Sequence, residues 1–137
     1  MLHCLALSLG TVVQMTDGEV TLRQLVSESH SIAAEHGFWD NDTNSRTMLL
    51  AEKIALVHSE ASEALEALRA GEPDFWIRED GDPKAGKAEG IVSELIDTVI
   101  RCADILGALM PADEVETAYI VKREYNKGRK FKHGKQF

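Results

Sequence analysis

The sequence has few cysteines, no long apolar run and no recognisable export signal. Cys4 and Cys102 are the only cysteines, and no C-x-x-C motif occurs, which excludes a disulfide framework and fits a reducing compartment. No apolar run reaches the roughly 18 residues that a membrane-spanning helix needs. Residues 1–14 are apolar, but they lack the cationic start and the cleavage site of a secretory signal. We therefore expect a cytoplasmic protein with no membrane partner.

Metal-binding patterns based on histidine are also missing. The five histidines show no ligand spacing, and there is no Glu-x-x-His pattern of the ferritin-like di-iron type. His58 is close in sequence to a group of acids, but a lone histidine is more often a packed or hydrogen-bonded residue. A metal site in this chain is therefore expected to use carboxylates, which suit hard cations.

The formal net charge of -8 is unevenly distributed along the chain. The last 16 residues carry seven lysines and arginines against one acid, Glu124, so the rest of the chain is strongly acidic. An acidic body with a basic end fits a phosphorylated small molecule held between a metal site and cations. Nucleic acid is an unlikely partner, because the body of the chain is strongly acidic. A solvated helix end is the simpler explanation of the same charges.

Apolar periodicity predicts four helices and almost no strand. We expect helices over residues 21–36, 44–70, 88–109 and 111–126, with Gly37 and Gly71 ending the first two. The long segment 71–90 is expected to be a surface loop or flap. These elements predict an all-α, four-helix bundle-type protomer over residues 21–137, preceded by an N-terminal arm (residues 1–20) to which we assign no role.

Two apolar stripes are expected to face the interior of the bundle. The stripe of the second helix comprises Leu50, Ile54, Val57, Ala61, Ala64 and Leu68. That of the third helix comprises Ile91, Leu95, Val99, Cys102, Leu106 and Leu109.

Two pairs of acids stand out on consecutive helices. Glu60 and Glu63 are three residues apart on the second helix, and Glu94 and Asp97 are three apart on the third. Such spacing projects both members of a pair from one side of a helix. Antiparallel packing would bring all four carboxylates together, an arrangement that favours Mg²⁺. Solvated acids on a helix surface are the alternative explanation, and spacing alone leaves both open.

Four separated motifs resemble those of MazG-like nucleotide pyrophosphohydrolases. The segment LVHSEASEALEA (residues 56–67) is similar to the first metal-binding helix of that family, and ELID (94–97) to its second motif, E-x-x-D. HGFWD (36–40) resembles the aromatic turn after the first helix. KREYNKGR (122–129), followed by HGK (133–135), resembles the closing motif. The gap between the acidic pairs is long for the family, which implies an insertion within residues 71–90.

The resemblance implies an enzyme that hydrolyses nucleoside triphosphates to monophosphates and pyrophosphate, with a role in cleaning nucleotide pools. It implies that Glu60, Glu63, Glu94 and Asp97 bind Mg²⁺, with Mn²⁺ as the alternative ion, and that Glu63 or Glu60 also acts catalytically on the attacking water. It further implies a homo-oligomer, either a dimer or a tetramer, with sites near subunit interfaces. The substrate-binding residues implied are Lys122, Asn126, Arg129 and Trp39.

Several alternatives remain open at this stage. Trp39 is equally compatible with a core or interface role, and Trp76 is a weaker candidate for capping a pocket. Lys53 and Arg101 either balance the charge of the acids or form structural ion pairs. The whole chain could instead be a non-catalytic helical oligomer that senses nucleotides or interacts with nucleic acid. A pyrophosphohydrolase for a dedicated metabolite such as phosphoribosyl-ATP is a further alternative.

Overall fold

The computed structural model describes residues 19–40 and 45–130. Four helices dominate them: α1 (Leu22–Glu35), α2 (Arg46–Ala70), α3 (Ile91–Leu109) and α4 (Ala112–Lys127). The predicted all-α class is confirmed. Most of the N-terminal arm and the end of the basic tail, including the HGK motif, lie outside the described residues. No helix in the described ranges is long and apolar enough to cross a bilayer.

Side-chain and glycine caps set the ends of the first two helices. The Oγ1 atom of Thr21 accepts a hydrogen bond from the backbone N–H of Gln24, and the Oγ atom of Ser45 accepts one from Met48. Gly37 and Gly71 have φ angles of 76° and 68°, in the left-handed region where a glycine costs least. The predicted helix-ending role of both glycines is confirmed.

The segment before α3 differs from the prediction. Ala88–Glu89 forms strand β2, which pairs antiparallel with β1 (Trp76–Ile77) in a two-stranded hairpin. The prediction that the third helix begins near residue 88 was therefore wrong, and α3 begins at Ile91. A strand of two residues has no measurable alternation, so only the pairing across the loop reveals it.

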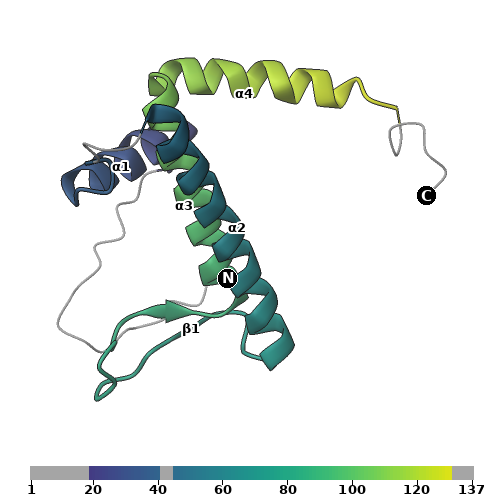
Figure 1. Cartoon of the computed structure of the whole chain (residues 1–137). Helices are drawn as coiled ribbons and strands as arrows, with labels where there is room; N and C mark the ends of the chain where they lie inside the picture. The colour runs from purple at the N-terminus through teal and green to yellow at the C-terminus, as the bar shows by residue number, and fades with distance from the viewer. Residues whose placement is uncertain (1–18, 41–44, 131–137) are drawn as a thin grey trace.

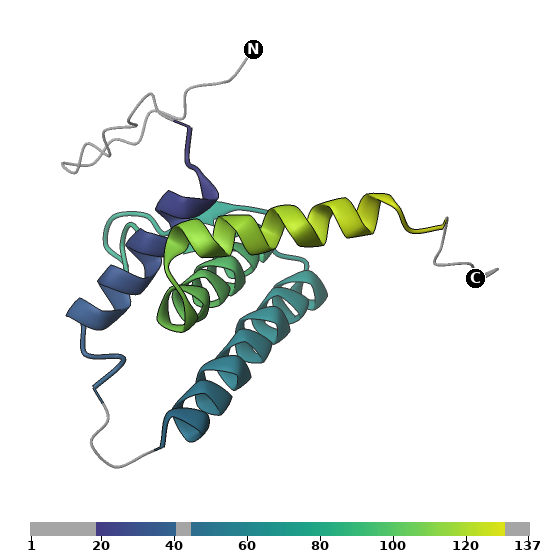
Figure 2. The ribbon, with the colours of Figure 1, turned by 90° about the horizontal axis from the view of Figure 1, so that it is seen from above.

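Helices α2 and α3 lie side by side and run antiparallel, and α1 packs against α3 (Figures 1 and 2). A small buried core of Val26, Ala103 and Val115 joins α1, α3 and the start of α4. Helix α4 makes no contact with α2 within the described ranges, and its later turns extend away from the other helices (Figure 1). A single chain is therefore three packed helices with a projecting fourth.

Most residues of the predicted inward stripes are not buried in a single chain, although Ala64 is. On α2, Ile54 and Leu68 are 51% and 61% exposed, and the buried residues are Lys53, Glu60, Ala64 and Ala67. On α3, five of the six stripe residues are exposed, among them Leu95 and Val99. Polar side chains that pair across the two helices occupy the buried faces instead, which leaves the more apolar faces on the surface.

Candidate functional site

Three carboxylates from two helices converge where the first turns of α3 lie against the middle of α2. Glu60 on α2 and Glu94 and Asp97 on α3 each offer an oxygen, and these oxygens lie within 4.8 Å of one another. Glu60 and Glu94 are both only 7% exposed. The antiparallel packing of the helices creates this group, because it places the acidic turn of each helix opposite that of the other.

Burial and mutual repulsion disfavour the charged forms of the two acids on α3. The pKa of Glu94 is raised, first by burial and then by repulsion from Glu63, with Lys87 opposing the shift. Burial also raises the pKa of Asp97, Glu60 adds repulsion, and Arg101 opposes it. A bound cation would remove this penalty, and three carboxylate oxygens are a donor set that fits Mg²⁺ or Mn²⁺.

Glu63 lies outside this group of three. Its side chain is exposed, and it lines a second hollow of about 330 Å³ together with Glu94. Three of the four expected metal ligands are thus brought together. The fourth, Glu63, shares the second hollow with Glu94. Three further acids line this hollow: Glu66, Glu72 and Glu89.

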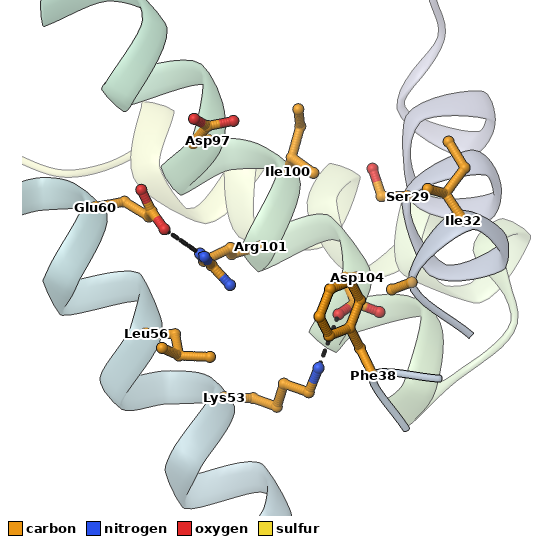
Figure 3. A pocket seen from close by; sticks show the side chains of 11 residues that line it. Ser29, Ile32, Phe38, Lys53, Leu56, Glu60, Asp97, Ile100, Arg101 and Asp104 are labelled. Carbon is orange, nitrogen blue, oxygen red and sulfur yellow. Dashed lines mark hydrogen bonds and ion pairs between the residues drawn. The ribbon is translucent and has the colours of Figure 1, made fainter. Parts of the chain in front are cut away.

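A cavity of about 520 Å³ adjoins the carboxylates, between α1, α2 and α3 (Figure 3). Its apolar lining includes Phe38, Leu56 and Ile100. Glu60 and Asp97 form part of its wall, together with four more polar residues: Ser29, Lys53, Arg101 and Asp104. One cavity therefore combines acids that can hold a cation, an aromatic ring and two basic side chains.

A polar network closes one end of the cavity. Asp104 Oδ1 accepts a hydrogen bond of 2.7 Å from the indole N–H of Trp39 and lies 2.9 Å from His30 Nδ1. The ammonium of Lys53 is 3.8 Å from Asp104 Oδ2 and 4.7 Å from the centre of the Trp39 ring. Trp39 is consequently held edge-on to His30, with ring centres 5.3 Å apart. These contacts fix the aromatic turn against α2 and α3.

Phe38, His30 and Asp104 were not predicted as site residues from the sequence. A detectable signal existed for part of the network: Lys53 precedes Glu60 by seven residues, and Asp104 follows Asp97 by seven. A spacing of seven is close to two helical turns, so each residue shares a face with an acid of the site. His30 and Phe38 had no such signal, because only the packing of α1 on α3 brings them near.

Other candidate residues do not line the cavity of their own chain. Lys122, Asn126 and Arg129 are exposed on or just after α4, and the cavity lining contains no residue of that helix. His58 is exposed on α2, and Trp76 belongs to the hairpin and is likewise absent from the lining. Trp39 is half-buried beside the cavity, bonded to Asp104.

The arrangement can hold a hard cation next to a cavity large enough for a small organic ligand. No family model, curated protein or solved structure matches the chain.

Proposed function

We propose that this chain is a Mg²⁺-dependent nucleoside triphosphate pyrophosphohydrolase that produces a nucleoside monophosphate and pyrophosphate. The observation that carries the proposal is the convergence of Glu60, Glu94 and Asp97 beside a cavity that holds aromatic and basic side chains. The resemblance of four motifs to MazG-like enzymes supports the same reaction. Cytoplasmic location and a role in nucleotide-pool cleaning belong to this proposal.

The three carboxylates, joined by Glu63, would hold the cation. When bound, Mg²⁺ would neutralise part of the negative charge of the phosphates and lower the pKa of the attacking water. Glu63 is exposed at the edge of the group and is free to orient that water and accept its proton. Phosphoryl chemistry depends mainly on positioning and electrostatics, so these acids and the nearby cations suffice as catalytic groups.

The cavity suits the rest of the nucleotide. Phe38 and the apolar wall provide a surface for a base, and the edge of Trp39 is fixed close by. Lys53 and Arg101 provide positive charge next to the acids. Lys122, Asn126 and Arg129 are the remaining proposed substrate-binding residues, and all three are solvent-accessible on the projecting helix or just after it.

A second copy of the chain is part of the proposal. Large apolar side chains are exposed along α2, α3 and α4, including Leu68, Val99 and Tyr125, which are 61%, 50% and 65% exposed. A surface of this kind is typical of a subunit interface. A dimer or tetramer that covers these faces would turn the open arrangement of one chain into a four-helix bundle-type assembly.

The test is pyrophosphate release from a panel of ribo- and deoxyribonucleoside triphosphates, with and without Mg²⁺. We expect Mg²⁺-dependent formation of monophosphate and pyrophosphate, and no turnover by Glu94→Gln. Activity on phosphoribosyl-ATP alone would narrow the reaction to a dedicated metabolite. Nucleotide binding without turnover would contradict the enzyme assignment in favour of a nucleotide sensor, and salt-dependent RNA or DNA binding without turnover would favour the nucleic-acid alternative.

A further inference from the structure

Arg101 reaches from α3 across to α2 and pairs with one acid of the carboxylate group. Its Nε and Nη2 atoms both lie 2.5 Å from Oε1 of Glu60 (Figure 3). In the part of the chain that the structure describes, Glu60 is the one member of the group with an ion-pair partner. The charge of Glu60 is therefore balanced by the protein itself when no metal is bound.

Glu94 is in the opposite situation. It is 7% exposed, its carboxylate forms no hydrogen bond or ion pair with any described residue, and one of its oxygens faces those of Glu60 and Asp97. Burying an unpartnered carboxylate is costly, so this side chain indicates that a cation belongs in the group. Such a cation would draw on the carboxylate of Glu60, whose Oε1 atom Arg101 now engages.

We propose that Arg101 and a divalent cation compete for Glu60, and that cation binding releases Arg101 to the anionic group of the ligand in the adjoining cavity. The inference rests on the proposed function. The guanidinium already lines the cavity, and the side chain is 39% exposed, so it can turn without leaving the cavity. A planar guanidinium matches the geometry of phosphate oxygens, which makes it an effective ligand for a phosphate once released.

Competition predicts effects of opposite sign on the two ligands. In Arg101→Met, the cation no longer displaces or repels a guanidinium, so we expect Mn²⁺ to bind roughly tenfold more tightly. In the same variant, Mg²⁺-pyrophosphate loses its guanidinium partner and should bind roughly tenfold more weakly. If the guanidinium merely orients Glu60 for the metal, Arg101→Met should weaken the binding of both Mn²⁺ and Mg²⁺-pyrophosphate.

The first experiment measures Mn²⁺ binding by electron paramagnetic resonance without nucleotide, and pyrophosphate binding by calorimetry in saturating Mg²⁺. The matched control is Arg23→Met, because Arg23 forms an exposed ion pair with Glu116 and lines neither hollow. It removes the same charge and should leave both affinities unchanged. Arg101→Lys retains the charge without the fork, so it should restore part of the pyrophosphate affinity.

The second experiment follows the Arg101 Nε–H resonance by nuclear magnetic resonance in the full chain. Adding Mg²⁺ should shift it away from its position when bonded to Glu60, and adding pyrophosphate should shift it again. If the wild type binds Mn²⁺ and Arg101→Met binds it equally well or more weakly, the proposed competition is wrong. The proposed function would not be affected by that result. Absence of Mn²⁺ binding by the wild type would contradict both proposals.

Discussion

Replacing Glu94 by glutamine should stabilise the metal-free protein and remove its response to metal. Each like-charge pair in the carboxylate group involves oxygens within 4.8 Å. At that separation, two unit charges repel by about 0.9 kcal/mol in water and about 3.5 kcal/mol at an effective dielectric constant of 20. Asp97 has no ion-pair partner among the described residues, so its repulsion with Glu94 is offset only in part, by the charges of Arg101 and Lys87. We expect Glu94→Gln to raise the free energy of unfolding by about 1 kcal/mol at pH 7.

The advantage of the variant should depend on pH with a definite sign. The pKa of Glu94 is raised in the folded state, mainly by burial. A raised pKa means that the folded state holds the proton of Glu94 more tightly than the unfolded state does. The contribution of Glu94 to the stability of the wild type is therefore most favourable below the pKa that Glu94 has in the unfolded chain. That stability is lost as the pH rises through the folded pKa. The difference between Glu94→Gln and the wild type should therefore be largest near neutrality and vanish below about pH 4.

Mg²⁺ should reverse the order of stability. A ligand at 100 times its Kd stabilises the folded state by about 2.7 kcal/mol, which exceeds the expected gain from the substitution. The assay is urea unfolding of both proteins with and without Mg²⁺, and the control is Glu52→Gln, since Glu52 is exposed on α2 and forms no ion pair among the described residues. A Glu94→Gln protein less stable than the wild type without metal would refute the electrostatic reasoning.

Three further predictions address catalysis, substrate binding and assembly. Glu63→Gln should remove most pyrophosphate release while changing stability by less than about 0.5 kcal/mol, because Glu63 is exposed; wild-type turnover would exclude its proposed role. Lys122→Ala should raise KM several-fold without a matching loss of stability, and an unchanged KM would identify Lys122 as a surface charge only. Val99→Glu, on the exposed apolar face of α3, should shift sedimentation from an oligomer to a monomer; a wild type that already sediments as a monomer would contradict the proposed interface.

Local signals in the sequence located the helices and most of their ends. Thr21 offers a hydroxyl at the start of α1, Gly37 and Gly71 adopt φ angles that other residues rarely take, and Pro111 precedes α4. Each of these effects acts within a few residues of the chain. The hairpin strand Ala88–Glu89 was not predicted, because the strand with which it pairs, Trp76–Ile77, lies across a loop.

Part of the candidate site could also be predicted from local features of the sequence. The spacing of Glu60, Glu94 and Asp97 places each on a helix face, and antiparallel packing was the one further assumption needed to bring them together. The network around Asp104 could not be predicted in full from the sequence, because His30 and Trp39 are more than 60 residues from Asp104 along the chain. Contacts over such separations leave no period in the sequence.

The sequence by itself determined the all-α class, most of the helix limits and the acidic pairs, since propensity, capping and i, i+3 spacing are local properties. The tertiary structure decided which face of α2 turns inward. Both faces carry apolar residues, and the buried one is chosen by pairs that cross the helices, such as Arg101 with Glu60 and Lys53 with Asp104. It also decided that α4 departs from the bundle and that the cavity borders the carboxylates, because both depend on how the helices pack.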